Sequence, residues 1–409
     1  MGERGLLTPA LAGIVASLVG FASTFALVLA GLRAVGADPR QASSGLLALC
    51  VLMGVVVIWL ALRTRMPVAI AWSTPGAALL ISSGDVPGGY PAALGAFAVA
   101  GALIVLCGLW RPLGRWIGAI PVPVAGAMLA GVILPLCVAP VKAVVELPWQ
   151  AGPVVAIWLL LTLFARRWAV PGAMAATVAA IAIAGDLPPG ALSDPWPEVA
   201  VTAPALDLGA LVGLALPLFI VTMASQNVPG MAVLASFGYR PPLRPVLVTT
   251  GAATAAGAPF GAHAINLAAI TAALVAGPEA GPDPARRWVA AVSSGIAYLA
   301  LGLAAGAATA VVAAAPPLLI EGAAGLALLA TLGAALSTAL AGSDHREAAT
   351  ITFVISASGI AVAGISAPFW GLAGGLAFLG AQRLGTARPA RAVREPADAV
   401  EGTGATGSG

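Results

Sequence analysis

The sequence predicts an all-α integral membrane protein with fourteen transmembrane segments, arranged as a 7+7 inverted repeat. Three features predict this class: an apolar composition, an alternation of basic residues along the chain, and motifs that recur in both halves. Of the 409 residues, 60% are hydrophobic and 9% are charged, whereas charged residues make up about a quarter of a soluble domain. Such a chain cannot cover a water-facing surface, so it must face the lipid bilayer. The composition therefore excludes a soluble enzyme, a nucleic-acid binder and a disordered scaffold.

Charged residues and Pro/Gly clusters divide the chain into apolar segments. Several of these are shorter than the about 20 residues that a helix needs to cross the hydrocarbon core. The segments are 8–36, 42–62, 67–84, 90–110, 118–139, 151–165, 169–185, 207–238, 242–258, 259–277, 285–314, 316–341, 345–361 and 363–383.

The placement of basic residues supports this division and gives an orientation. With the N-terminus in the cytoplasm, 16 of the 19 Lys and Arg residues lie on the cytoplasmic side. Only Arg33, Arg40 and Lys142 lie outside, and the outside loop 186–206 has acidic residues but no basic ones. The positive-inside rule then predicts a multi-pass protein of a bacterial cytoplasmic membrane with both termini cytoplasmic.

Short motifs recur in the same order in the two halves. Leu32–Pro39 (LRAVGADP) resembles Leu234–Pro241 (LASFGYRP), and each closes a long apolar segment. Further on, Pro67–Thr74 (PVAIAWST) corresponds to Pro259–Asn266 (PFGAHAIN). Because seven segments separate the copies, the second half must be inverted in the membrane. Inverted repeats are typical of transporters and predict a substrate site at the repeat interface near the midplane.

The two corresponding segments 67–84 and 259–277 each read as an extended stretch followed by a half-helix. In the first, Thr74 is expected to cap the helix and Pro75 to occupy its first position. In the second, Asn266 is expected as the cap of a half-helix over Leu267–Ala276. In an inverted repeat the two helix N-termini face each other near the bilayer centre.

A pair of facing N-termini predicts an anion site. Each terminus offers unpaired N–H groups and about half a positive charge, which together can hold an anion without Lys or Arg. Gln226 and Asn227 lie deep in the eighth segment, at the position of Thr24 in the first, and either contact the substrate or join helices. The predicted substrate-binding residues are Ser73, Thr74, Gly76, Thr24, Gln226, Asn227, His263 and Asn266.

Two ionisable residues inside the segments are candidates for proton coupling. His263 is the only histidine within a segment, and ionisable groups in a membrane are usually functional. Glu321 is the only acidic residue well inside an apolar run, where the favourable helix dipole is a sufficient structural explanation and a proton relay is the alternative. The three cysteines, Cys50, Cys107 and Cys137, lack metal-binding spacing. We expect no catalytic residue, cofactor or metal, because HExxH and GxSxG motifs are absent as well.

Three motifs carry a family resemblance. Pro67–Ala78 (PVAIAWSTPGAA), Ser225–Gly230 (SQNVPG) and Pro259–Asn266 resemble the bacterial benzoate:proton symporter family. The resemblance covers about residues 5–384, and that family is similar in fold to uracil permeases and sulfate-type transporters. It implies import of benzoate with protons, by a core domain that moves against a gate domain.

The implied domains follow the repeat. The core would comprise residues 1–116 and 207–315, the gate residues 117–206 and 316–384, and the remainder, 385–409, reads as a disordered tail. Many relatives of this fold form dimers through the gate, so a homodimer is one expected assembly. The expected partners are benzoate, protons and the lipid bilayer, with no nucleic acid.

This chain departs from the wider fold in one respect. Uracil-permease-type relatives carry acidic residues in the eighth and tenth spans, where this chain has Gln226, Asn227, His263 and Asn266. Neutral donors suit a carboxylate substrate, and they leave His263, Glu321 or the substrate itself as the proton carrier. The alternatives are a nucleobase or inorganic-anion transporter of the same fold, or an anion channel.

Overall fold

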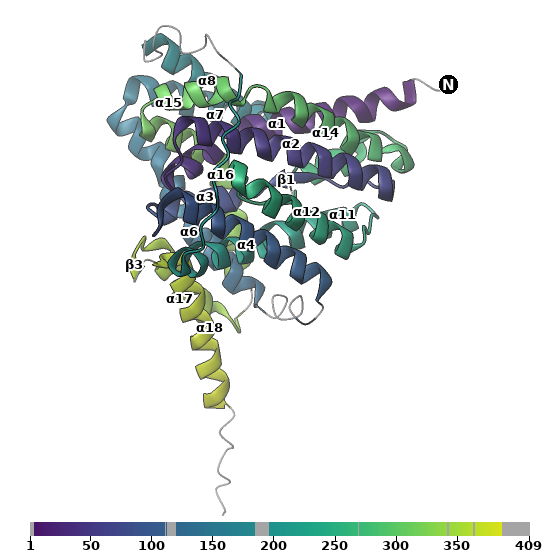
Figure 1. The fold of residues 1–409 in the computed structure, drawn as a ribbon. Helices are drawn as coiled ribbons and strands as arrows, with labels where there is room; N and C mark the ends of the chain where they lie inside the picture. Colours follow the sequence, from purple (N-terminus) through teal and green to yellow (C-terminus); the bar gives the residue numbers. More distant parts are fainter. Residues whose placement is uncertain are drawn as a thin grey trace, which may run out of the picture.

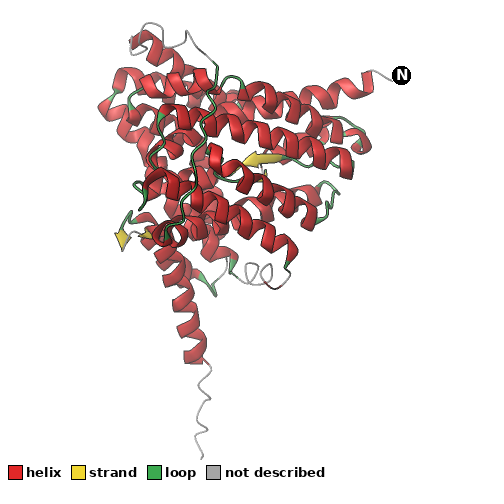
Figure 2. Cartoon of the chain, viewed as in Figure 1, coloured by secondary structure: helices red, strands yellow, loops and turns green. Residues whose placement is uncertain are grey.

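The computed structural model describes residues 4–110, 112, 120–184, 196–268, 270–341, 343–362 and 365–386. Within these ranges the chain is mainly helical, with a few short strands among the helices (Figures 1 and 2). The last helix continues to Thr386, and the rest of the predicted tail, 387–409, lies outside the described residues.

The first half begins with long helices and contains one short strand. Asp38 starts the second helix through a capping box with Gln41, and Pro39 occupies an early helical position. The elements are α1 (Arg4–Ala34), α2 (Pro39–Thr64), β1 (Ile70–Trp72), α3 (Thr74–Ser83), α4 (Gly89–Leu109), α6 (Val122–Glu146), α7 (Pro148–Phe164), a 3₁₀ turn η1 (Arg166–Trp168) and α8 (Ala169–Ala184).

The second half begins with one continuous helical segment that contains two π-helical turns. It comprises α9 (Leu208–Ala210), η2 (Leu211–Ala215, π), α10 (Leu216–Thr222), η3 (Met223–Asn227, π) and α11 (Val228–Ser236). There follow α12 (Leu243–Gly257), η4 (Ala258–Phe260), β2 (Ile265–Leu267), α13 (Ile270–Ala276), η5 (Pro278–Ala280), η6 (Pro284–Arg286), α14 (Trp288–Gly302), α15 (Ala305–Ala314), α16 (Pro317–Leu340), α17 (Arg346–Ala357), β3 (Ala361–Val362), β4 (Ile365–Ser366) and α18 (Ala367–Thr386).

Several of these helices can cross a membrane. Among the described residues six are long and apolar enough, and a seventh span results if the pair Pro284–Gly302 and Ala305–Ala314, bent by 57°, is taken as one. Helices α7 and α8 are apolar but shorter. The mainly helical membrane class is therefore confirmed, whereas the count of fourteen segments and the 7+7 repeat stay predictions.

Helices from the two halves pack directly against each other. Both α1 and α2 lie along α14, α4 along α12, and α6 along α16 (Figure 1). Small residues allow close approach: a Cβ on Gly101 would lie 2.7 Å from the Gly251 carbonyl oxygen, and one on Gly54 2.8 Å from that of Gly295. Membrane helices associate through such contacts because lipid gives no hydrophobic drive between them.

The strands β1 and β2 form a short antiparallel ribbon between the helices. Ala71 pairs with Asn266, and the ribbon is extended by the Ser73 N–H, which donates to the Ala264 carbonyl at 2.9 Å. Each strand satisfies backbone groups of the other, as irregular backbone at membrane depth requires. Because the strands are antiparallel, α3 and α13 leave the ribbon from opposite ends. A second ribbon, β3 with β4, was not expected from the sequence.

The predicted form of the two broken segments, an extended stretch before a short helix, is confirmed, but both predicted caps are wrong. Ser73, not Thr74, caps α3, and Thr74 is its first residue. Asn266 lies inside β2, and α13 begins at Ile270 instead of Leu267. Pairing with β1 keeps residues 265–267 extended, so the helix starts later.

Candidate functional site

Ser73 joins the two broken segments, and residues 70–73 with 263–267 are called the crossing below. The side chain of Ser73 is fully buried. Its Oγ accepts from the Gly76 N–H at 3.1 Å, which caps α3, and from the Thr222 hydroxyl at 3.1 Å. Three distant parts of the chain, in β1, α10 and the stretch before β2, therefore meet at one serine.

His263 packs against the same serine from the other segment. Its Nε2 lies 3.1 Å from the Ser73 carbonyl oxygen, and a carbonyl oxygen only accepts, so Nε2 carries the hydrogen. The Phe97 ring meets the imidazole edge-on at 6.3 Å between centroids. The other ring nitrogen, Nδ1, is buried without a hydrogen-bond partner in the described part of the chain. A neutral His263 thus presents a buried lone pair that can accept a proton.

Asn266 holds the crossing together. With its amide oriented to satisfy both neighbours, its oxygen accepts from the Ser73 N–H at 3.0 Å and its nitrogen donates to the Leu267 carbonyl at 2.8 Å. The side chain is fully buried. Both ends of the amide are engaged by backbone, so Asn266 positions the crossing.

The two amides of the eighth segment differ in their surroundings. Asn227 is buried; its Oδ1 accepts from the Leu267 N–H at 3.0 Å, and its Nδ2 donates to the Met223 sulfur at 3.3 Å. Gln226 is half-buried, and its side chain forms no hydrogen bond within the described ranges. Both lie in the π-helical turn η3, a type of distortion often found at functional sites. Asn227 therefore joins helix to strand, whereas Gln226 remains available to a ligand.

An aromatic cluster lies beside the crossing. Phe21 and Phe25 of α1 are stacked at 5.3 Å, Trp72 lies 5.8 Å from Phe21, and Tyr298 lies 6.5 Å from Trp72. The indole N–H of Trp72 donates to the Thr24 hydroxyl at 2.9 Å. Thr24 thus orients the indole, and the cluster provides flat apolar surface at the start of α3.

The first turn of α3 has few free donors. Pro75 has no N–H, Gly76 donates to Ser73 Oγ, and Ala77 donates to the Ser73 carbonyl at 2.8 Å. Half-buried Thr74 keeps its N–H and its hydroxyl. A Cβ on Gly76 would come within 2.7 Å of a Leu218 methyl group, so this position requires glycine for close packing.

Glu321 lies apart from these residues. It is half-buried on α16, and its neighbour Gly322 packs against Ala143, at the end of α6 that carries Lys142. The Lys142 ammonium acts electrostatically on the Glu321 carboxylate. No hydrogen bond or ion pair joins Glu321 to the crossing within the described residues.

Sequence reasoning missed two residues that position the site. Thr222 bonds Ser73, and its place four residues before Gln226 on one helix could have indicated it. Arg287, classed only as a cytoplasmic charge, is 8% exposed and donates to the Ala276 carbonyl at 2.7 Å and the Gly281 carbonyl at 2.9 Å. It therefore caps the C-terminus of α13, where a cation is favourable.

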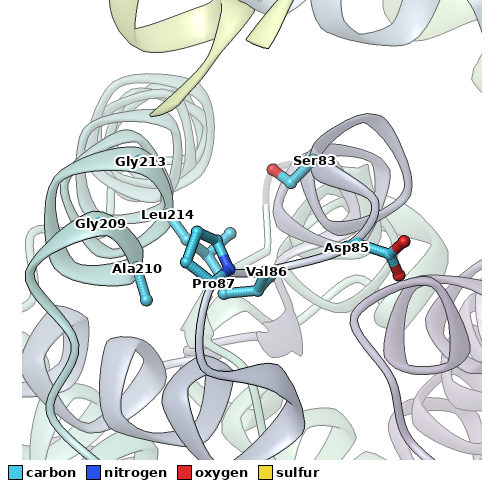
Figure 3. Close-up of a pocket in the computed structure, with 8 residues that line it drawn as sticks. All are labelled: Ser83, Asp85, Val86, Pro87, Gly209, Ala210, Gly213 and Leu214. Carbon is cyan, nitrogen blue, oxygen red and sulfur yellow. The ribbon is translucent and has the colours of Figure 1, made fainter. Parts of the chain in front are cut away.

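A surface hollow lies at the other end of α3 (Figure 3). Counting its open mouth it measures about 210 Å³, between Ser83, Asp85, Val86 and Pro87 on one side and Gly209, Ala210, Gly213 and Leu214 on the other. It is separated from Ser73 by the length of α3, so it does not coincide with the predicted substrate site.

Comparisons with known proteins agree on a family. A family model described as benzoate membrane transport protein matches residues 6–381. The chain is 40% identical over 374 residues to the inner membrane protein YdcO of Escherichia coli, covering 90% of this chain and 94% of that one. It is 28% identical over 375 residues to a benzoate membrane transport protein of Acinetobacter baylyi, with the same coverage.

Solved structures show the fold. The transmembrane domain of the cyanobacterial bicarbonate transporter BicA is similar with a TM-score of 0.59 at 15% identity, covering 92% of this chain and 98% of that one. SLC26A9 is similar with a TM-score of 0.60 at 15% identity, covering 92% of this chain and 65% of that one. At such identities the likeness concerns the fold alone.

Proposed function

The chain belongs to the benzoate membrane transport protein family, and on that premise we propose that it imports benzoate together with a proton. It is a membrane transporter with the fold of BicA and SLC26A9, in a bacterial inner membrane. The crossing is the observation that carries the proposal. Two broken segments meet there, beside aromatic rings, with amide, hydroxyl and imidazole groups. Residues 70–73 and 263–267, which form the crossing, include no Lys or Arg.

The carboxylate binds at the start of α3. Thr74 supplies an N–H and a hydroxyl, and the amide of Gln226 lies about one helical turn beyond Thr222, which itself contacts Ser73. The dipole of α3 adds positive potential at this end. Gly76, Asn227 and Asn266 shape the site through the backbone, whereas Thr74 and Gln226 contact the anion.

The benzoate ring lies against the aromatic cluster. Stacked or edge-on aromatic pairs contribute about 0.5–1.5 kcal/mol beyond the area that they bury. Thr24 fixes the indole of Trp72 in its place, and Phe25 is only half-buried, so its ring has surface left to offer. This arrangement favours a flat aromatic acid over a small inorganic anion.

His263 carries the proton in this mechanism. Its Nδ1 is a buried acceptor without a partner, and a proton there offsets the charge of the bound carboxylate. Glu321 is a less suitable carrier because its neighbour Gly322 packs against the end of α6 that carries Lys142. The substrate's own carboxylate is the remaining alternative.

Transport then follows the predicted architecture. Fourteen segments in a 7+7 inverted repeat, with both termini cytoplasmic, would form a core (1–116 and 207–315) that moves against a gate (117–206 and 316–384). The packing of α1 and α3 against α16 and α6 supports a core–gate interface beside the crossing. A homodimer through the gate is part of the same proposal.

Uptake of labelled benzoate into proteoliposomes tests the function. We expect saturable accumulation when the outside is more acidic, and collapse of the accumulation when a protonophore removes the gradient. Uptake that ignores the gradient would refute proton coupling, and non-saturable flux would indicate a channel. Saturable uptake of labelled uracil, sulfate or bicarbonate, without saturable uptake of labelled benzoate, would assign a different substrate to the same fold.

A further inference from the structure

We propose that Tyr90 relays protons, through bound water, between the predicted outer surface and Nδ1 of His263. This inference rests on the proposed proton-coupled transport and deepens it by assigning a route to the buried imidazole. It adds a residue of α4 that the sequence analysis did not single out.

Two buried polar atoms without partners line one packing interface. The Tyr90 hydroxyl and His263 Nδ1 both lack a hydrogen-bond partner within the described residues, and the two side chains are 5% and 0% exposed. An unsatisfied buried polar atom costs about 1–3 kcal/mol, and ordered water commonly satisfies such groups. In the proposed relay, water bound between α4 and the stretch before β2 satisfies both atoms.

The geometry places these atoms along one line. Tyr90 and Phe97 are seven residues apart on α4, two helical turns, so they lie on the same face. The Phe97 ring meets the His263 ring, while the Tyr90 hydroxyl lies against Gly261, two residues before His263: a Cβ there would come within 2.7 Å of it. The chain from Gly261 to His263 thus follows α4 from the tyrosine towards the imidazole.

Glycines let the backbone segments approach each other closely at the tyrosine end. Gly261 has φ +97°, a conformation that glycine adopts without strain, and a Cβ on it would also lie 2.9 Å from Gly45 Cα. Next to Gly45, the Ser44 hydroxyl bonds the Phe260 carbonyl at 3.0 Å, and its oxygen lone pairs can still accept from water. The wall of the route is therefore backbone and hydroxyl groups.

The tyrosine end of this line reaches the surface. Tyr90 follows the first residue of α4 and packs against Gly36 in the turn between α1 and α2. The exposed Asp38 of that turn acts electrostatically on the Tyr90 hydroxyl. A carboxylate therefore lies at the outer end of the proposed relay.

Other charged groups near this end are already engaged or more distant. Asp207 faces Gly88, just before α4, and caps α9 through the Ala210 N–H. Arg40 forms an ion pair with Glu198, and Asp85 lines the hollow beyond α3. Asp38 also caps α2 through the Gln41 N–H, and it is the carboxylate that acts electrostatically on the Tyr90 hydroxyl.

Proton movement along this line conserves every atom. A hydronium ion at the surface gives a proton to the Tyr90 oxygen and becomes water, the original Tyr90 O–H proton passes to the next water, and that water gives up a proton to Nδ1. The net change is one proton taken from the outside medium and one imidazolium formed. Nε2 keeps its hydrogen bond to Ser73 throughout.

Tyr90→Phe tests the relay because it removes only the hydroxyl. Two modes are compared in proteoliposomes: net benzoate uptake driven by a pH gradient, and benzoate counterflow at equal pH, in which the proton stays bound. We expect net uptake to slow by about tenfold or more, a modest loss for a proton-transfer group, with counterflow within about twofold. Tyr239→Phe is the matched control, since its hydroxyl bonds the Pro284 carbonyl far from this line; it should leave both modes unchanged.

Each outcome either supports or overturns the proposed relay. Net uptake by Tyr90→Phe equal to that of the unmodified protein overturns the relay, and so does an equal slowing of both modes, which indicates a structural role. An unchanged melting temperature shows that the variant is folded. If the unmodified protein transports benzoate in neither mode, the proposed function fails and the relay falls with it.

Discussion

Replacing His263 by Gln separates the two roles that the structure gives this residue. The imidazole donates from Nε2 to the Ser73 carbonyl, and a glutamine amide can donate from a similar position. Glutamine does not titrate, so His263→Gln keeps the contact and removes the proton site. We expect the variant to bind benzoate within about twofold of the unmodified protein and to exchange it in counterflow, but to lose gradient-driven accumulation.

The size of the positioning effect follows from the partners of the Ser73 carbonyl. This oxygen also accepts from the Ala77 N–H at 2.8 Å, so loss of the histidine donor does not leave it unsatisfied. The cost is then that of one hydrogen bond, about 1 kcal/mol of folding stability. His263→Leu should therefore lower the free energy of unfolding by about 1 kcal/mol, measured by thermal unfolding in detergent, and should also lose accumulation.

His345→Gln is the control, because His345 is the other histidine of the chain and lies in the turn before α17. It should accumulate benzoate normally. Normal accumulation by His263→Gln would refute the reasoning and leave Glu321 or the substrate's carboxylate as the proton carrier. A loss of binding by more than tenfold in His263→Gln would instead show that the amide does not replace the imidazole contact.

Three further predictions concern other parts of the molecule. Thr24→Val leaves the Trp72 N–H without its acceptor and should lower the free energy of unfolding by about 1–3 kcal/mol. Adding Trp72→Phe removes the unpaired donor, so the effects of the two changes on thermal unfolding should be non-additive. Additive effects would contradict the pairing. Arg65 has φ 54° and lies 4.4 Å over the Trp288 ring. Glycine at position 65 would remove about 1–2 kcal/mol of left-handed backbone strain, which exceeds the about 0.5–1 kcal/mol of the exposed cation–π contact that it loses. Melting temperatures should therefore decrease in the order Gly, Arg, Ala at position 65. A lower melting temperature for the Gly variant than for the Ala variant would contradict this reasoning. Asp85 is exposed beside the hollow and repels an approaching carboxylate by about 0.5 kcal/mol across ~8 Å of water; Asp85→Asn should lower the KM for benzoate about twofold at low ionic strength, and a difference that persists at about 1 M salt would rule out this cause.

Local sequence was sufficient to locate the broken segments. Pro67 and the run Ser73–Gly76 predict an extended stretch followed by a helix start, and the structure has β1 and α3 there. The apolar composition was sufficient to predict the membrane class, because a chain with 9% charged residues cannot form a water-facing surface. These features depend on neighbouring residues and on composition, which a single sequence displays directly.

The cap residues depended on partners that are far away in the sequence. Ser73 and Thr74 are both favourable N-cap residues by type. In the structure the cap is Ser73, which also contacts Thr222 and Ala264 from distant parts of the chain. Asn266 resembles a cap by residue type, but pairing with Ala71 holds it in a strand. No local pattern displays such pairing.

The same limit applied to the candidate binding residues. Thr24, Asn227 and Asn266 were expected to contact substrate, yet the hydroxyl of Thr24 accepts from the Trp72 indole and both amides bind backbone groups of β2. The π-helical turns in the eighth segment also lack a residue signature. Residue type indicated which polar groups lie deep in the spans, but their partners decide whether they bind a ligand or another segment.

The ribbon of β1 and β2 has a consequence for how the protein is made. The Ser73 carbonyl and the His263 ring are 190 residues apart in the chain. At a synthesis rate of about 5–20 residues per second, roughly 10–40 s pass between the appearance of the two strands. During that interval the backbone of β1 has no strand partner, and unsatisfied groups in lipid cost several kcal/mol each. The backbone of β1 must therefore stay in contact with the insertion machinery or with water until β2 has been synthesised and can pair with it.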